Sequence, residues 1–144
     1  MQSLKRCSCP NNSLFVFALV SWIWFLCFEL FLRIYSLYRH APLVDVPSHF
    51  FAGIAIFASA LWYFSLTSVW NKRAWSFVVV LAAALLWEIF EKLQELVVYN
   101  PPFLVDVFFW DGFGDVLVTL TGGLAGLGIL LFIKRSTRWI ETEF

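Results

Sequence analysis

The sequence predicts an all-α protein: a four-helix transmembrane bundle with short loops. The main observation is a set of long stretches without Asp, Glu, Lys, Arg or His, at residues 14–28, 50–71 and 116–133. A fourth stretch, residues 74–87, ends where Glu88 begins a group of charges. A membrane-spanning helix needs about 20 mostly apolar residues, and a soluble core does not need such runs. We therefore expect a polytopic membrane protein.

Composition supports this class and limits the partners. Of the 144 residues, 61% are hydrophobic and only 14% are charged, so four spans leave too little chain for a separate soluble domain. We expect a single membrane domain over residues 1–144. The formal net charge of zero gives a nucleic-acid partner no electrostatic support. Membrane lipids are the expected contacts, and a membrane-protein partner or a second copy of the chain remains open.

The first two spans are expected at residues 14–35 and 48–69. Glu29 and Arg33, near the end of the first, are spaced i, i+4 in the order that favours an ion pair. The second follows a polar loop that contains two prolines, and Asp45 is placed to cap its first free backbone N–H groups.

The last two spans are expected at residues 74–98 and 111–133. Only the short turn 70–73 precedes the third span, so the second and third should form an antiparallel hairpin. Asn100-Pro101-Pro102 then interrupts the helix. The aromatic residues of the segment 99–110 suit the headgroup region, so we expect a loop on the membrane surface there.

Basic residues predict the orientation. Seven of the ten Lys and Arg residues fall on the side of both termini and of the turn between the second and third spans. Those on the opposite side are Arg33, Arg39 and Lys92. The positive-inside rule then places both termini in the cytoplasm and the protein in the cytoplasmic (inner) membrane.

The polar residues within the spans converge at the outer end under this topology. Glu29 and Glu88 lie about 21–23 Å from the inner boundary at a rise of about 1.5 Å per residue, inside a hydrocarbon core of about 30 Å. Glu91 shares the face of Glu88. His49 opens the second span, and Asp111 and Asp115 enter the fourth at the same level.

The fourth span carries one polar and small-residue stripe along a helix face: Asp111, Asp115, Thr119, Gly122 and Gly126. Small residues in such a stripe are typical of close helix contacts in lipid. The stripe therefore predicts that both aspartates face the interior of the bundle.

Carboxylates gathered outside bulk water cannot all stay ionised unless a cation joins them. We expect a divalent metal ion, whose identity the ligands leave open among Mg²⁺, Mn²⁺, Ca²⁺ and Zn²⁺. It would hold a phosphate or pyrophosphate headgroup or generate a nucleophilic water. Asp106 is a further oxygen donor in reach of this level. The expected ligands, of which all but Glu91 are also candidate catalytic groups, are His49, Glu88, Glu91, Asp111 and Asp115.

Less specific readings of the same residues remain open. Glu29 with Arg33, and Glu88 with Lys92, could be simple ion pairs. The whole set could be a polar vestibule that hydrates the outer end of the bundle.

Three motifs across residues 45–123 resemble the VanZ-like and YjdF-like small bacterial membrane proteins. Those families carry Asp-x-x-x-His-Phe at the start of one helix, matched here by Asp45-Val46-Pro47-Ser48-His49-Phe50. Their next helix carries Glu near its end, as at Glu88 and Glu91. Their last helix opens with Asp and continues to a Gly, matched by Trp110-Asp111, Asp115 and Gly122.

The sequence departs from the VanZ-like pattern at Val46, where those proteins usually have Lys, and at Thr119, where they usually have Asn. The Arg often found in the loop before the last helix is also missing. The resemblance implies a role in the cell envelope, since one VanZ-like branch is associated with tolerance of glycopeptide antibiotics. Whether the chain is an enzyme stays open.

Three functions fit these observations. The first is a metal-dependent enzyme or binder that acts on a lipid or envelope headgroup. The second is a non-catalytic accessory or structural membrane protein. The third, a small transporter component, lacks a polar route through the inner half of the bundle.

Overall fold

The computed structural model describes residues 12–35, 45–99 and 105–142. Within this part of the chain the regular structure is entirely α-helical, which confirms the predicted class. The four helices are α1 (Asn12–Ile34), α2 (Val46–Ser65), α3 (Lys72–Tyr99) and α4 (Val105–Thr142).

Each helix contains a stretch long and apolar enough to cross a membrane. These stretches are Asn12–Ile34, Val46–Ser65, Lys72–Gln94 and Gly112–Arg135. They hold 20 to 24 residues, and a rise of about 1.5 Å per residue makes them about 30–36 Å long. That length matches the hydrocarbon core of a bilayer. The chain is therefore a multi-pass membrane protein.

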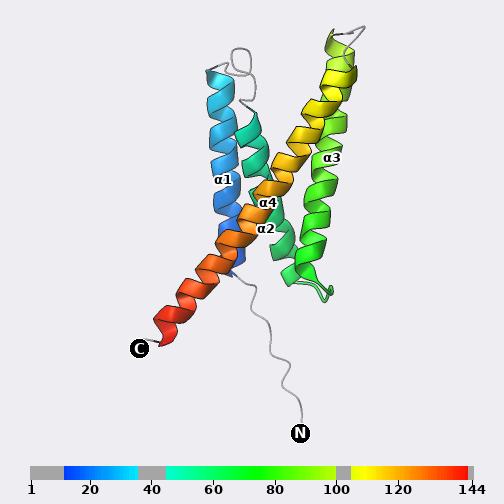
Figure 1. The fold of residues 1–144 in the computed structure, drawn as a ribbon. Helices are drawn as coiled ribbons and strands as arrows, with labels where there is room; N and C mark the ends of the chain where they lie inside the picture. The colour runs from blue at the N-terminus through cyan, green and yellow to red at the C-terminus, as the bar shows by residue number, and fades with distance from the viewer. Residues whose placement is uncertain (1–11, 36–44, 100–104, 143–144) are drawn as a thin grey trace.

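Helix α2 lies at the centre of the bundle, in contact with each of the other three helices. Figure 1 shows α1 and α3 on either side of it, with α4 crossing it diagonally. Helix α4 also packs against α3. This central position explains why α2 supplies half of the buried hydrophobic residues in the described part of the chain, among them Ala55, Phe57 and Ala58.

Two glycines allow α2 and α4 to cross with their backbones in contact. A methyl group on Gly53 would overlap the carbonyl oxygen of Thr119, and one on Gly122 would overlap the carbonyl oxygen of Phe50. Gly126 continues the contact against Ile54 and Phe57. In lipid, where hydrophobic burial does not drive helices together, such close approach supplies the packing energy.

Helix α1 is joined to α2 by aromatic contacts and by side-chain hydrogen bonds. The Trp22 indole donates to the Ser59 hydroxyl at 2.9 Å. The rings of Phe15 and Trp62 lie 5.2 Å apart, centroid to centroid. Because α2 covers only one face of α1, large side chains such as Trp24 remain exposed to the surroundings, as expected where lipid is the solvent.

Helix α3 runs antiparallel to both of its neighbours. Near its start, the Lys72 ammonium donates to the Ser65 carbonyl at the end of α2 at 3.2 Å. Phe77 packs on Phe57 of α2, with ring centroids 4.7 Å apart, and also lies against Gly123 of α4. The hairpin predicted from the short turn is therefore present.

The end of α2 was predicted at residue 69, which is wrong by one turn. The helix ends at Ser65, whose hydroxyl donates to the Trp62 carbonyl at 2.6 Å. Thr67 donates to the Phe64 carbonyl in the same way at 3.0 Å. These hydroxyl groups satisfy backbone carbonyls that would otherwise need an N–H from a further helical turn, so the helix can end here. Asn71, with φ of 53°, then reverses the chain into α3.

The predicted surface loop over 99–110 is also wrong in extent. Helix α3 continues to Tyr99, and α4 already begins at Val105, before the expected start at residue 111. Val105–Trp110 contains neither Pro nor Gly, so nothing in it prevents helix formation. For the same reason α4 continues past residue 133 to Thr142.

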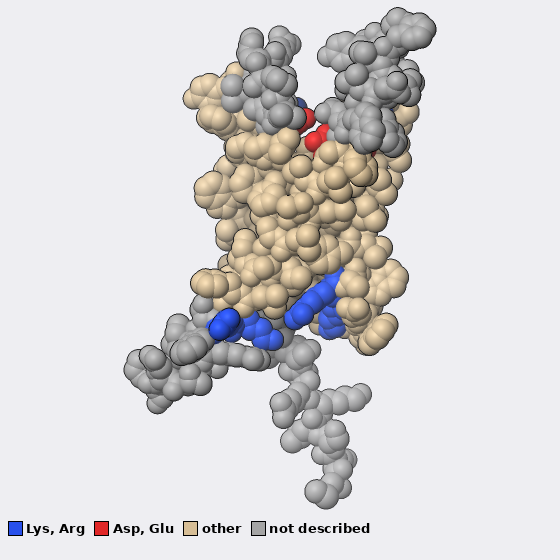
Figure 2. Space-filling model, viewed as in Figure 1, with Lys and Arg blue, Asp and Glu red and all other residues tan. Residues whose placement is uncertain are grey.

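Charged side chains separate to the two ends of the bundle. Figure 2 shows acidic atoms at one end of the apolar surface and most of the visible Lys and Arg at the other. Lys72 and Arg73 begin α3 at the basic end, and Lys134 and Arg135 end the apolar stretch of α4 there. We refer below to these two ends as the acidic end and the basic end.

Candidate metal site at the acidic end of the bundle

His49 is the central residue of the candidate site. It lies in the first turn of α2, where its backbone N–H donates to the Asp45 carbonyl at 3.1 Å. Its side chain is 12% exposed. The helix begins at Val46 because Pro47 fits the first turn, where no backbone N–H is required.

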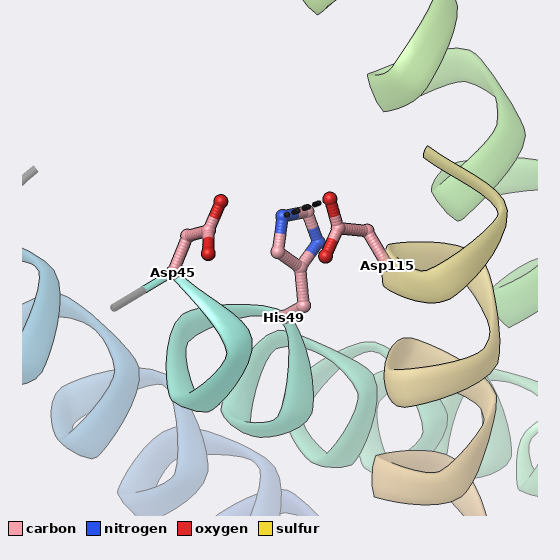
Figure 3. Close-up of side chains that lie close together, drawn as sticks. All are labelled: Asp45, His49 and Asp115. Atoms are coloured by element: carbon pink, nitrogen blue, oxygen red, sulfur yellow. Dashed lines mark ion pairs between the residues drawn. The ribbon is translucent and has the colours of Figure 1, made fainter. Parts of the chain in front are cut away.

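Asp45 takes the capping position of α2, but its side chain does not cap the helix. No hydrogen bond joins its carboxylate to the free N–H groups, so the predicted side-chain cap is absent. Residues four apart share a face of a helix. The Asp45 carboxylate therefore stands beside the His49 imidazole instead (Figure 3).

Asp115 approaches the same imidazole from α4. Its Oδ2 lies 3.8 Å from Nε2 of His49, and its side chain is 9% exposed. This separation is too long for a hydrogen bond. It is shorter than twice a metal–ligand distance, since such distances run from about 2.0 Å to 2.6 Å for Zn²⁺ and Ca²⁺. One ion can therefore touch both atoms.

Two groups of potential metal ligands meet at His49. One consists of Asp45, His49 and Asp115, and the other of His49, Glu88 and Glu91. Within each group, one ligand atom from every residue lies within 4.8 Å of the others. Four carboxylates, from the N-cap of α2 and from α3 and α4, thus gather around the single imidazole of His49.

Glu88 reaches this position because α4 has a glycine opposite it. A methyl group on Gly112 would lie 2.6 Å from the Glu88 Oε2 atom, inside van der Waals contact. That oxygen is buried. The absence of a side chain at Gly112 therefore makes room for the carboxylate between α3 and α4.

Thr119 lies one turn below Asp115 and is 3% exposed. Its hydroxyl donates to the Asp115 carbonyl at 2.8 Å, and the same oxygen lies 3.5 Å from Nδ1 of His49. With Gly122 and Gly126 also buried, the predicted inward-facing stripe of α4 is present from Asp115 onward.

The ligands lie at the acidic end of the apolar stretches. His49 is in the first turn of α2. Glu88 and Glu91 follow the uncharged stretch 74–87 of α3, and Asp115 precedes the uncharged stretch 116–133 of α4.

Glu29 belongs to a different arrangement. Its Oε1 pairs with Arg33 Nη2 at 2.8 Å, which confirms the predicted i, i+4 ion pair. Its Oε2 accepts a hydrogen bond from Ser48 at 2.6 Å. Glu29 thus joins α1 to the start of α2.

The side chains of Asp106 and Asp111 lie outside the part of the chain that the structure describes. Their backbones fall within α4, and their roles as ligands stay predictions. Of the other predicted ligands, the structure brings together His49, Glu88, Glu91 and Asp115.

Sequence reasoning missed two members of the site. Asp45 was interpreted as a cap, although its spacing of four from His49 signals a shared helix face. Gly112 carried no signal, because its role depends on which residue of α3 lies opposite.

Four carboxylates around one imidazole form a set of hard oxygen donors with one nitrogen. Their mutual repulsion in a partly buried position is relieved by a cation. Such a set suits Mg²⁺, Mn²⁺, Ca²⁺ or Zn²⁺. A bound ion would supply a positive charge able to hold a phosphate oxygen or to activate a water.

No protein-family model matches the chain, and comparison with curated proteins and with solved structures gives no match.

Proposed function

We propose that this membrane protein binds a divalent cation through His49 and the carboxylates around it, and uses it to recognise or act on a phosphate-bearing lipid or cell-envelope headgroup. The observation that carries the proposal is the position of His49 in two ligand groups supplied by three helices. Ion pairing within single helices does not explain that arrangement, because only Glu88 among these carboxylates has a Lys or Arg one turn away on its own helix, Lys92.

The place of the ligands along the helices supports a headgroup as the second partner. His49 is in the first turn of α2, and Asp115, Glu88 and Glu91 adjoin the ends of the uncharged stretches of α4 and α3. A site at the end of apolar spans lies nearer to lipid headgroups than to the centre of the bilayer.

An accessory role is the alternative, and the VanZ-like resemblance is its support. In that case the acidic end would only hydrate the bundle or contact another membrane protein. The two functions differ in whether a ligand binds in a metal-dependent manner.

A binding experiment separates them. Isothermal titration calorimetry would use detergent-purified protein with Mn²⁺, dihexanoyl phosphatidic acid as the lipid probe and inorganic phosphate as the free anion. The proposal predicts binding of the lipid that disappears with EDTA and in His49→Ala. Binding of inorganic phosphate without binding of the lipid would show that the site recognises the free anion and not a headgroup. Unchanged lipid binding after EDTA would contradict the proposal.

We further propose that the acidic end faces away from the cytoplasm, with both termini inside. The basic end carries Lys72, Arg73, Lys134 and Arg135, which the positive-inside rule places in the cytoplasm. Labelling of single cysteines with an impermeant maleimide in intact cells would test this. Reaction at Thr67→Cys, next to the basic end, but not at Tyr35→Cys would show that the orientation is the reverse of the one proposed.

A further inference from the structure

The hydroxyl of Thr119 makes two contacts, and they are unequal. Its oxygen is 2.8 Å from the Asp115 carbonyl oxygen one turn earlier in α4. It is 3.5 Å from Nδ1 of His49, which belongs to α2. Thr119 is almost fully buried, so water does not compete freely for either contact.

A hydroxyl has one proton to donate and lone pairs to accept with. A carbonyl oxygen can only accept, so the 2.8 Å contact uses the hydroxyl proton. Toward His49 the hydroxyl then offers only a lone pair. The favourable partner for that lone pair is an N–H, which places the proton of a neutral imidazole on Nδ1.

We propose that Thr119 is a positioning residue that fixes the tautomer of His49, with the proton on Nδ1 and the lone pair on Nε2. This inference rests on the proposed cation site and specifies how it is built. Nε2 is the atom that lies 3.8 Å from Asp115 Oδ2. The tautomer therefore directs the ligating nitrogen toward a carboxylate. In metal-bound histidines, one ring nitrogen binds the metal and the second usually donates a hydrogen bond that fixes the tautomer.

One consequence concerns stoichiometry. If Nδ1 is committed to Thr119, His49 has a single ligand atom. The two groups that share His49 then cannot each hold an ion through it at the same time. The proposed tautomer therefore allows one ion per imidazole.

The chain offers a matched control for Thr119. Thr121 donates to the Leu117 carbonyl at 2.8 Å, the same bond to the residue four before it, but its side chain is on the exposed face of α4. Thr121→Val removes that bond without touching His49. Thr119→Ser keeps the hydroxyl and deletes only a methyl group.

The tautomer can be read without any metal. The chain has two histidines, so a His40→Gln background leaves His49 as the only imidazole. In metal-free, ¹⁵N-labelled protein at a pH where His49 is neutral, two-bond ¹H–¹⁵N spectra distinguish the protonated from the unprotonated nitrogen. We expect protonated Nδ1 in the wild type, in Thr119→Ser and in Thr121→Val, and a mixture of tautomers in Thr119→Val.

The metal measurement is separate. Thr119→Val should weaken ion affinity by about 10- to 100-fold, the usual effect of removing such an outer partner, and Thr119→Ser should restore it. A wild-type His49 with its proton on Nε2 overturns the inference even if Thr119→Val does not fold. The correct tautomer in a protein that binds no ion would leave the inference standing and contradict the proposed function.

Discussion

Gly53 of α2 lies directly against the backbone carbonyl of Thr119 on α4. The same Thr119 carries the hydroxyl that approaches His49. The closest contact between the two helices is therefore linked to the geometry of the site. If α2 and α4 were moved apart by the width of a methyl group, the contact between Thr119 and the imidazole would be lost.

Gly53→Ala should therefore destabilise the bundle. The added methyl would overlap main-chain atoms, which cannot rotate away, so the helices must separate. Overpacking of this kind costs about 1–3 kcal/mol. Thermal unfolding in detergent, followed by circular dichroism, would measure it.

Gly128→Ala is the control for that prediction. Gly128 also lies within α4, but a methyl there would have no atom within 4 Å. Alanine in a helix interior is favoured over glycine by about 0.5–1 kcal/mol. Equal melting temperatures for the two variants would show that the α2–α4 contact is not as close as described.

A second glycine should affect the site and spare the fold. In Gly112→Ala the new methyl meets the Glu88 Oε2 atom, the far end of a flexible side chain, so the carboxylate can move aside at little cost in stability. Metal affinity should fall by about 10- to 100-fold, as when a supporting group is disturbed.

The comparison variant is Gly114→Ala, two residues along, where a methyl has nothing within 4 Å. Calorimetric titration of Mn²⁺ into both proteins would measure the difference. If both bind the ion as the wild type does, Glu88 is not a ligand.

Glu29 should stabilise the bundle through Ser48 more than through Arg33. Ser48 is buried and its bond to the carboxylate is 2.6 Å long, and a hydrogen bond to a charged group contributes about 1.5–3 kcal/mol. The Arg33 side chain is 67% exposed, and an exposed ion pair contributes about 0–1 kcal/mol.

Ser48→Ala should accordingly lower the melting temperature more than Arg33→Ala does. Thermal unfolding of the two single variants and the double variant would test the order. A larger loss in Arg33→Ala would show that charge neutralisation of Glu29 governs this end of α1.

The existence and order of the four helices could be predicted because a membrane span has a strong local signal, namely length and the absence of charge. The end of α2 and the two ends of α4 could not. The early end of α2 depends on hydroxyl groups of Ser65 and Thr67 that bond to the preceding turn. The early start of α4 at Val105 agrees with the absence of Pro and Gly from residues 105–110, which a count of interfacial aromatics hides.

The candidate site could likewise be predicted only in part. Grouping His49 with Asp115, Glu88 and Glu91 required only helix rise and the order of the spans. Two other features depend on how the helices rotate and approach one another. The Asp45 carboxylate stands beside His49 instead of capping α2, and Glu88 fits against Gly112. Those features arise from packing between segments far apart in the sequence.

Metal analysis of the purified protein tests the central claim most directly. The protein would be purified in detergent through a tag without histidine, and its content of Mg, Mn, Ca and Zn measured by mass spectrometry after dialysis against each ion. The variants are His49→Ala, Asp115→Asn and, as the control, Glu29→Gln, which alters a carboxylate bound to Ser48 and Arg33.

We predict one divalent ion per chain in the wild type and in Glu29→Gln, and loss of that ion in His49→Ala and Asp115→Asn. A wild-type protein that retains no ion, or an ion retained equally in all four proteins, would contradict the account.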